Sequence, residues 1–135
     1  MYKTISINNQ NKIKILDQRK LPFKTRYIIT DNYKIVIKAI KNLSVRGAPA
    51  IGVAGGFAAF LAINKLRDNV NFKSKIKKML KEIESSRPTA VNLSWAIKKF
   101  YKIVDSKKNS LTELKKIFFN TSIDIEKEEI EVSNK

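Results

Sequence analysis

The feature that most restricts the fold is an uncharged run of small and apolar residues from Gly47 to Ile63. A helix that is apolar on every side is normally buried. Pro49 fits the first turn of a helix, where an N–H group has no intrahelical partner. We therefore expect a buried helix that begins near Ala48 or Pro49 and ends near Asn64, with the rest of the chain packed around it.

The same run admits other interpretations. The N-terminal amides of this helix point toward Arg46 and Gly47, so helix dipole, amides and guanidinium together could bind a phosphate. Alternatively, its glycines and alanines only let neighbouring helices approach closely. A membrane span is the third possibility, but the run is shorter than the ~20 residues that a span needs. We expect no membrane association.

Alternation of apolar and polar residues predicts a small antiparallel sheet before this helix. Thr4–Asn8 and Lys12–Leu16 place isoleucines on one face and are separated by an asparagine-rich turn. Arg26–Thr30 is a candidate third strand, and Pro22 indicates a turn or a sheet edge.

Four further helices are predicted from apolar residues at helical spacing. The first follows Asp31, which stands at the N-cap position, and runs to about Leu43. The next two lie on either side of the loop Ser85–Thr89, and the last opens with a capping box at Ser110–Glu113. The fold class is therefore α+β, mainly helical: a short N-terminal antiparallel sheet followed by a bundle of about five helices.

Composition limits the chemistry that this chain can perform. Its 135 residues suffice for one domain. Cysteine and histidine are both absent, which excludes disulfides, thiolate metal sites and histidine acid–base catalysis within the chain. No secretory signal is visible at the N-terminus, so a cytoplasmic protein is expected.

The net charge of +16 makes polyanion binding a competing function. Lysine supplies most of this charge and is spread along every segment, without a basic stripe interleaved with aromatic residues. We therefore expect loose adhesion at low salt but no specific nucleic-acid binding.

Three motifs carry a resemblance to a known family: Leu16–Pro22 (LDQRKLP), Val45–Gly52 (VRGAPAIG) and Arg87–Leu93 (RPTAVNL). In this order and spacing they resemble the N-terminal part of the S-methyl-5-thioribose-1-phosphate isomerases, enzymes of methionine salvage. These are related to the alpha, beta and delta subunits of translation initiation factor 2B. The resemblance covers essentially the whole chain but only about two-fifths of the family's usual length.

The resemblance implies an aldose–ketose isomerisation of 5-methylthioribose 1-phosphate. It implies that residues 1–30 form the small sheet region and residues 31–130 the helical bundle. A C-terminal Rossmann-like domain with the catalytic cysteine and aspartate would be absent from this chain. No catalytic residue, cofactor or metal is therefore expected here, and the chain alone is expected to be inactive.

Family roles carried onto matching positions make Arg46, Gly47, Ala48 and Arg87 the substrate-binding residues. In a chain that uses lysine nearly everywhere, two arginines at helix entrances suit a phosphate because a guanidinium binds it bidentately. Expected partners are the sugar phosphate, the missing C-terminal domain or a separate chain that carries it, and a second copy in a homodimer. A non-catalytic subunit-interaction module of the initiation-factor type is the alternative function.

Other polar residues are expected to have structural roles. Asp17 is interpreted as a turn residue, Asp31 as a helix cap, and the glutamates of Glu126–Glu131 as a solvated helix end. Thr89 and Asn92 are expected to orient the Arg87 loop through side-chain hydrogen bonds.

Overall fold

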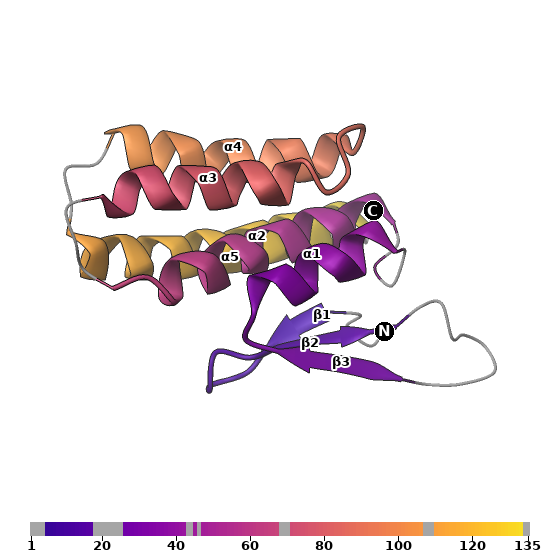
Figure 1. Ribbon diagram of the computed structural model, residues 1–135. Helices are drawn as coiled ribbons and strands as arrows, with labels where there is room; N and C mark the ends of the chain where they lie inside the picture. Colours follow the sequence, from indigo (N-terminus) through magenta and orange to yellow (C-terminus); the bar gives the residue numbers. More distant parts are fainter. Residues whose placement is uncertain are drawn as a thin grey trace.

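The computed structural model describes residues 5–17, 26–42, 45, 47–67, 71–106 and 110–133. A three-stranded sheet is followed by five helices in these ranges (Figure 1). The strands are β1 (Ile5–Ile7), β2 (Ile13–Leu16) and β3 (Tyr27–Thr30). The helices are α1 (Tyr33–Lys41), α2 (Ala48–Asn64), α3 (Phe72–Glu84), α4 (Val91–Ser106) and α5 (Leu111–Ser133). The predicted fold class is confirmed.

The sheet has the order β1-β2-β3, and both pairs of neighbours are antiparallel. Ile5 lies opposite Ile15 and Ile7 opposite Ile13, so the isoleucines share one face as the alternation predicted. Asn8 closes the turn because its side-chain oxygen accepts hydrogen bonds from the amides of Gln10 and Lys12. Pro22 lies outside the described residues.

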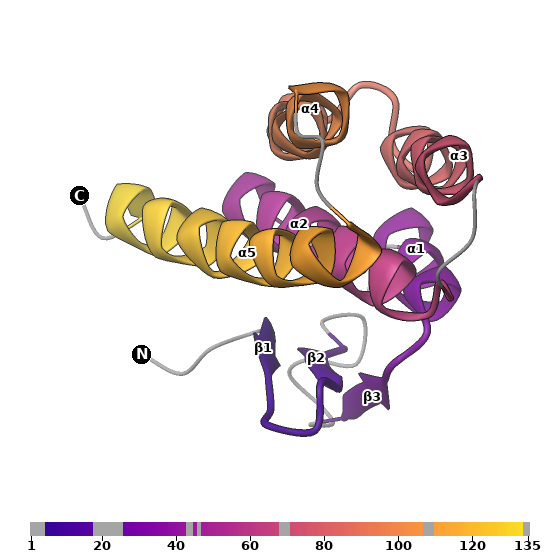
Figure 2. The ribbon, with the colours of Figure 1, turned by 90° about the vertical axis from the view of Figure 1, so that its left-hand side faces the viewer.

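The elements form three layers, seen most clearly in Figure 2. The sheet lies on one side of a layer made by α1, α2 and α5, and α3 and α4 cover the other side. Helix α2 contacts all four other helices and β1. Every residue from Ile51 to Ile63 is buried, which explains why a helix at the centre of three layers needs no polar face.

The glycines of α2 set how closely its neighbours approach. A Cβ atom on Gly55 would lie 2.5 Å from Cδ1 of Leu93 on α4, and one on Gly56 would lie 3.2 Å from Cδ1 of Ile125 on α5. Both neighbouring residues are fully buried. The interpretation of small residues as packing devices is therefore correct for this part of the helix.

Most helix ends lie where the sequence placed them. Ser110 and Glu113 form the predicted capping box, in which the Glu113 amide donates to Ser110 Oγ at 3.3 Å. The Ser110 amide donates back to Glu113 Oε1 at 3.4 Å. Helix α1 ends at Lys41, and Leu43 lies outside the described residues.

The assignment of Asp31 as a helix cap is wrong. The N-cap of α1 is Asn32, whose Oδ1 accepts from the Lys34 amide at 2.9 Å. Asp31 instead accepts a hydrogen bond from Lys65 Nζ at 3.0 Å, and this contact lowers the pKa of Asp31. Asp31 and Asn32 are adjacent in sequence. Because α1 begins at Tyr33, the N-cap position falls on Asn32.

Asp17 is buried directly after β2, and its amide extends the ladder by donating to the Arg26 carbonyl at 2.7 Å. The turn that it was predicted to begin falls on residues 18–25, which lie outside the described residues. The assignment of the glutamate run as a solvated helix end needs correction, although Glu128 is exposed. Helix α5 continues to Ser133, and both Glu126 and Glu129 are buried.

Candidate functional site

Three of the four predicted site residues, Gly47, Ala48 and Arg87, lie at one end of the helical layers. Helices α2 and α4 begin there, and α1, α3 and α5 end there (Figure 1). Arg46 lies outside the described residues, so its side chain is not placed. Gly47, Ala48 and Arg87 are described, and all belong to loops or first turns at this end.

Gly47 is the N-cap of α2 and has φ 89° and ψ 135°. L-residues rarely adopt this conformation, so glycine is required by the backbone. The Gly47 carbonyl accepts the first helical hydrogen bond from Ile51 at 3.0 Å. Gly47 and Ala48 are exposed, and no described atom lies within 4 Å of the position that a Cβ on Gly47 would take. No described residue therefore covers the entrance to α2 at Gly47.

Arg87 is half-buried in the turn between α3 and α4. Its carbonyl accepts from the Ala90 amide at 3.0 Å, which closes a turn with Pro88 at its second position. Ser94 Oγ donates to Glu84 at 3.0 Å and connects the start of α4 to the end of α3. The predicted placement of Arg87 at a loop-to-helix junction is confirmed.

Two side chains and one glycine connect the helices that carry these loops. Asn92 Nδ2 donates to both carboxylate oxygens of Glu129, at 3.1 and 3.2 Å. A Cβ atom on Gly52 would lie 3.0 Å from Glu129 Oε1 and 3.4 Å from Asn92 Cβ. Residues of α2, α4 and α5 therefore meet one turn behind the site loops.

Glu129 is the residue that the sequence interpretation missed. Its side chain is only 5% exposed. Burial raises the pKa of Glu129, the hydrogen bond from Asn92 opposes this shift, and the charge of Glu128 adds to it. A signal was present, because Glu129 follows the buried Phe118, Ser122 and Ile125 at helical spacing. Asn92 does have a supporting hydrogen bond, but its partner is Glu129 and not the Arg87 loop.

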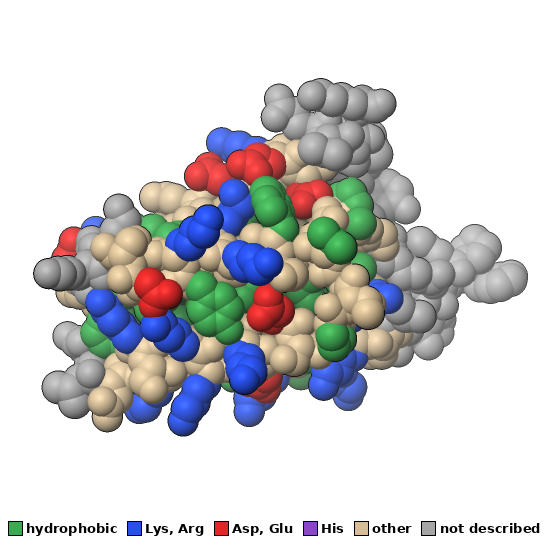
Figure 3. Space-filling view, turned by 90° about the horizontal axis from the view of Figure 1, so that it is seen from above, with side chains coloured by type: hydrophobic (Ala, Val, Ile, Leu, Met, Phe, Trp, Pro, Cys, Tyr) green, Lys and Arg blue, Asp and Glu red, His purple; other side chains and the backbone are tan. Residues whose placement is uncertain are grey.

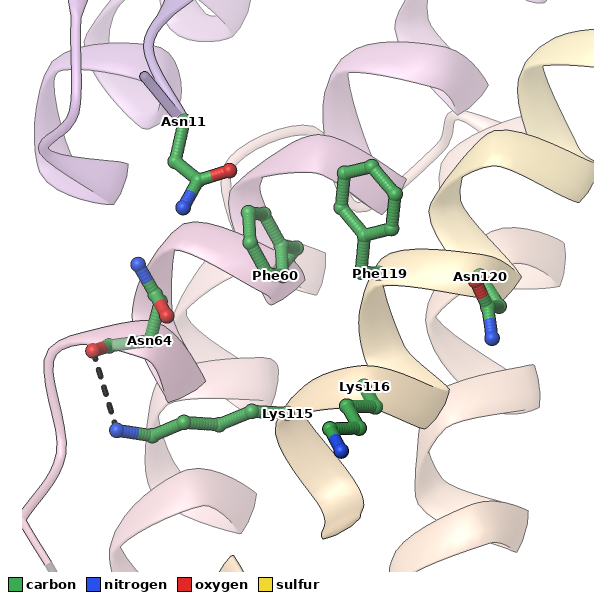
Figure 4. A pocket seen from close by; sticks show the side chains of 7 residues that line it. All are labelled: Asn11, Phe60, Asn64, Lys115, Lys116, Phe119 and Asn120. Atoms are coloured by element: carbon green, nitrogen blue, oxygen red, sulfur yellow. Dashed lines mark hydrogen bonds between the residues drawn. The ribbon is translucent and has the colours of Figure 1, made fainter. Parts of the chain in front are cut away.

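A separate open groove of about 430 Å³ lies at the opposite end of α2 (Figure 4). Its lining residues are Asn11, Phe60, Asn64, Lys115, Lys116, Phe119 and Asn120. Lys115 donates to the carbonyl of Asn64, the last residue of α2, at 3.3 Å and to that of Leu66 just beyond it at 2.7 Å. The groove contains none of the predicted site residues.

Charge on the face formed by α3 and α4 is mixed. Figure 3 shows lysine and arginine side chains scattered over this face, with acidic and apolar side chains between them. Among the described residues, no group of histidine, cysteine, aspartate and glutamate side chains could hold a metal ion. No described helix is long and apolar enough to cross a membrane.

Comparison with known proteins identifies the family. Residues 44–135 match the Initiation factor 2 subunit family, which is more than half of the chain. The chain belongs to this family. Its relatives include methylthioribose-1-phosphate isomerase 2 of Pseudothermotoga lettingae, 41% identical over 124 residues, or 92% of this chain and 36% of the relative. The 5-deoxyribose 1-phosphate isomerase of Clostridium botulinum strain Loch Maree is 42% identical over 130 residues, or 93% and 37% of the two chains.

Two solved structures of the family have the same fold as this member. The 5-methylthioribose 1-phosphate isomerase of Pyrococcus horikoshii has a TM-score of 0.88 and 31% identity, covering 95% of this chain and 36% of that one. The translation initiation factor eIF-2B subunit delta from A. fulgidus has a TM-score of 0.85 and 32% identity, covering 97% and 38%. This family member thus spans little more than a third of the length of these relatives.

Proposed function

We propose that this chain is the substrate-binding N-terminal part of an aldose–ketose isomerase that converts 5-methylthioribose 1-phosphate to 5-methylthioribulose 1-phosphate. The observation that carries the proposal is the open entrance of α2 at Gly47, on the same end of the bundle as the half-buried Arg87. A helix N-terminus attracts a phosphate through its free amides and its dipole.

In this proposal the phosphate lies at the entrance of α2 and is bound by Arg46 and the amides near Gly47 and Ala48. Arg87 reaches the phosphate or a sugar hydroxyl from the turn before α4. The anomeric phosphate blocks ordinary ring opening of the sugar, so the complete site must support opening and then move hydrogen between C1 and C2. The chain contributes binding and orientation, and the reacting groups belong to the C-terminal domain of the longer relatives.

Two substrates fit this chemistry, because relatives of similar identity are named for methylthioribose 1-phosphate and for 5-deoxyribose 1-phosphate. Both are pentose 1-phosphates that differ at C5. The residues proposed here bind the shared phosphate end, so they serve either substrate.

The test joins this chain to the part of the Pseudothermotoga lettingae relative that follows the matched segment. Turnover of both sugar phosphates is measured for this chimera and for the 135-residue chain alone. Arg46→Lys and Arg87→Lys are compared with Arg67→Lys, a matched control beyond the other end of α2. Because a hydrogen bond to a charged group contributes about 1.5–3 kcal/mol, each site variant should raise KM by about tenfold or more.

Activity in the chimera that is sensitive to Arg46 and Arg87 but not to Arg67 supports the proposal. A folded chimera that turns over neither substrate contradicts it, and turnover by the chain alone contradicts the assignment of catalysis to the C-terminal domain.

A subunit-interaction module is the second candidate, favoured by the structural likeness to the A. fulgidus subunit delta. It predicts that the chain binds a partner subunit with unchanged affinity in the two arginine variants.

A further inference from the structure

Glu129 is a buried carboxylate that the fold alone does not explain. It continues the buried stripe of α5, where an apolar side chain would avoid the cost of removing a carboxylate from water. Both of its oxygens accept hydrogen bonds from Asn92, at 3.1 and 3.2 Å. Replacing a buried polar pair by apolar residues is often neutral or stabilising, so its presence calls for another reason.

The position of this contact relates it to both site loops. Asn92 is five residues beyond Arg87, and Gly52 is five residues beyond Gly47. At a rise of 1.5 Å per residue, Gly52 lies about 7.5 Å along α2 from its entrance. Glu129 therefore contacts α2 and α4 directly behind the two loops proposed to bind the substrate.

Glycine at position 52 is part of the arrangement. A Cβ there would lie 3.0 Å from Glu129 Oε1 and 3.4 Å from the backbone oxygen of Asn92. The 3.0 Å distance is shorter than an ordinary contact between such atoms, and the 3.4 Å distance is at the short end of the ordinary range. The absence of a side chain on Gly52 thus lets the carboxylate and the start of α4 lie close to α2.

We propose that Glu129 is a positioning residue, which acts through Asn92 and against Gly52 to set the separation between the entrance of α2 and the Arg87 turn. This inference rests on the proposed function. The separation between the two loops matters because both are proposed to bind one phosphorylated sugar. A displacement of about 1 Å between binding groups is enough to weaken a multi-point site substantially. The carboxylate takes no part in the reaction itself.

The test exchanges the two functional groups. Asn92→Asp places two carboxylates face to face, Glu129→Gln removes the charge, and the double variant restores an amide–carboxylate pair in the opposite direction. Asn120→Asp is the matched control, since it makes the same change at an exposed position on α5 beside the distant groove (Figure 4). KM, kcat and Tm are measured in the chimera described above.

Asn92→Asp should raise KM about tenfold with a smaller change in kcat, and the double variant should return KM to within about threefold of the parent, as expected for directly coupled residues. Asn120→Asp should leave KM unchanged. A lower Tm for Asn92→Asp with an unchanged KM would overturn the proposal, as would a double variant that is no better than Asn92→Asp.

A second measurement on the 135-residue chain needs no activity. The backbone amide resonances of Gly47 and Arg87 should shift in Asn92→Asp and return in the double variant. Resonances that do not move would overturn the positioning role. If the arginine variants raise KM and the Asn92 and Glu129 variants do not, only the positioning role fails; if the arginine variants have no effect, the proposed function fails.

Discussion

Substitution of Gly55 by alanine tests whether close approach of α2 and α4 limits the stability of this fold. At an exposed helix position this change stabilises the folded protein by about 1 kcal/mol, because alanine has a higher helix propensity than glycine. Here the added Cβ would lie 2.5 Å from Cδ1 of Leu93, whereas carbon atoms in contact normally lie about 3.5–4.0 Å apart.

Leu93 cannot move aside easily, because it is fully buried. Overpacking of this kind costs about 1–3 kcal/mol, so the gain in propensity is outweighed. We expect a net loss of about 1 kcal/mol in the free energy of unfolding, which corresponds to a decrease in Tm of about 4 °C. Urea denaturation followed by circular dichroism, together with a thermal scan, measures both quantities.

Leu93→Ala in the Gly55→Ala background separates this mechanism from others. Leu93→Ala alone should cost about 2–5 kcal/mol through the cavity that it leaves. In the double variant the new methyl group occupies part of that cavity, so the loss should fall short of the sum by at least about 0.5 kcal/mol. Additive losses, or a Gly55→Ala protein more stable than the parent, would refute the packing argument.

Gly47→Ala is the matched control for this series. It makes the same chemical change at a position with no described neighbour within 4 Å, but with φ 89°. A loss of about 1–3 kcal/mol is expected there from backbone strain. Leu93→Ala should not reduce that loss, because the two positions do not share a cavity.

Three other predictions concern single polar contacts. Burial holds the pKa of Glu129 above its ordinary value of 4.5. As pH rises past that value, the unfolded state releases this proton before the native state does. The contribution of Glu129 to the free energy of unfolding therefore decreases as pH rises. The stability of Glu129→Gln relative to the parent should therefore increase between about pH 4 and pH 7 in urea titrations; a constant difference would contradict this. Lys115→Met should lower the free energy of unfolding by about 1–2 kcal/mol, because the carbonyls of Asn64 at the end of α2 and of Leu66 just beyond it lose a charged donor. Lys116→Met, at the neighbouring position, should lower it less. Tyr33→Phe should lower the free energy of unfolding by about 1 kcal/mol, because it removes the 2.8 Å hydrogen bond to Glu82. If Tyr33→Phe and Glu82→Gln are both as stable as the parent, this bond contributes nothing.

The sequence predicted the elements well because each has a strong local signal. The buried helix was placed at its observed bounds from Pro49 and from the absence of charge, and the capping box at Ser110 fixed the start of α5. The hairpin followed from alternation on either side of an asparagine-rich turn. These signals depend on neighbours in sequence, and tertiary contacts did not override them.

The candidate site was predicted less completely, because part of it depends on contacts between distant residues. Arg87 and Gly47 could be chosen from their positions at helix entrances. Glu129 could not be paired with Asn92 from sequence, since 37 residues separate them and a glutamate near a helix end is usually solvated. Asp31 illustrates the opposite difficulty: it had the right residue type for a cap, but Asn32 follows it immediately and occupies that position.

The central position of α2 also affects how the chain reaches its native state. This helix packs most extensively against α5, the last element of the described chain, and it is apolar on every side. The partner with which it packs most extensively is therefore the last to be synthesised. Until α5 is synthesised, one side of α2 has no intramolecular cover, and exposed apolar surface of this kind promotes aggregation. Completion of α5, rather than formation of α2, should limit when the newly made chain becomes resistant to proteases.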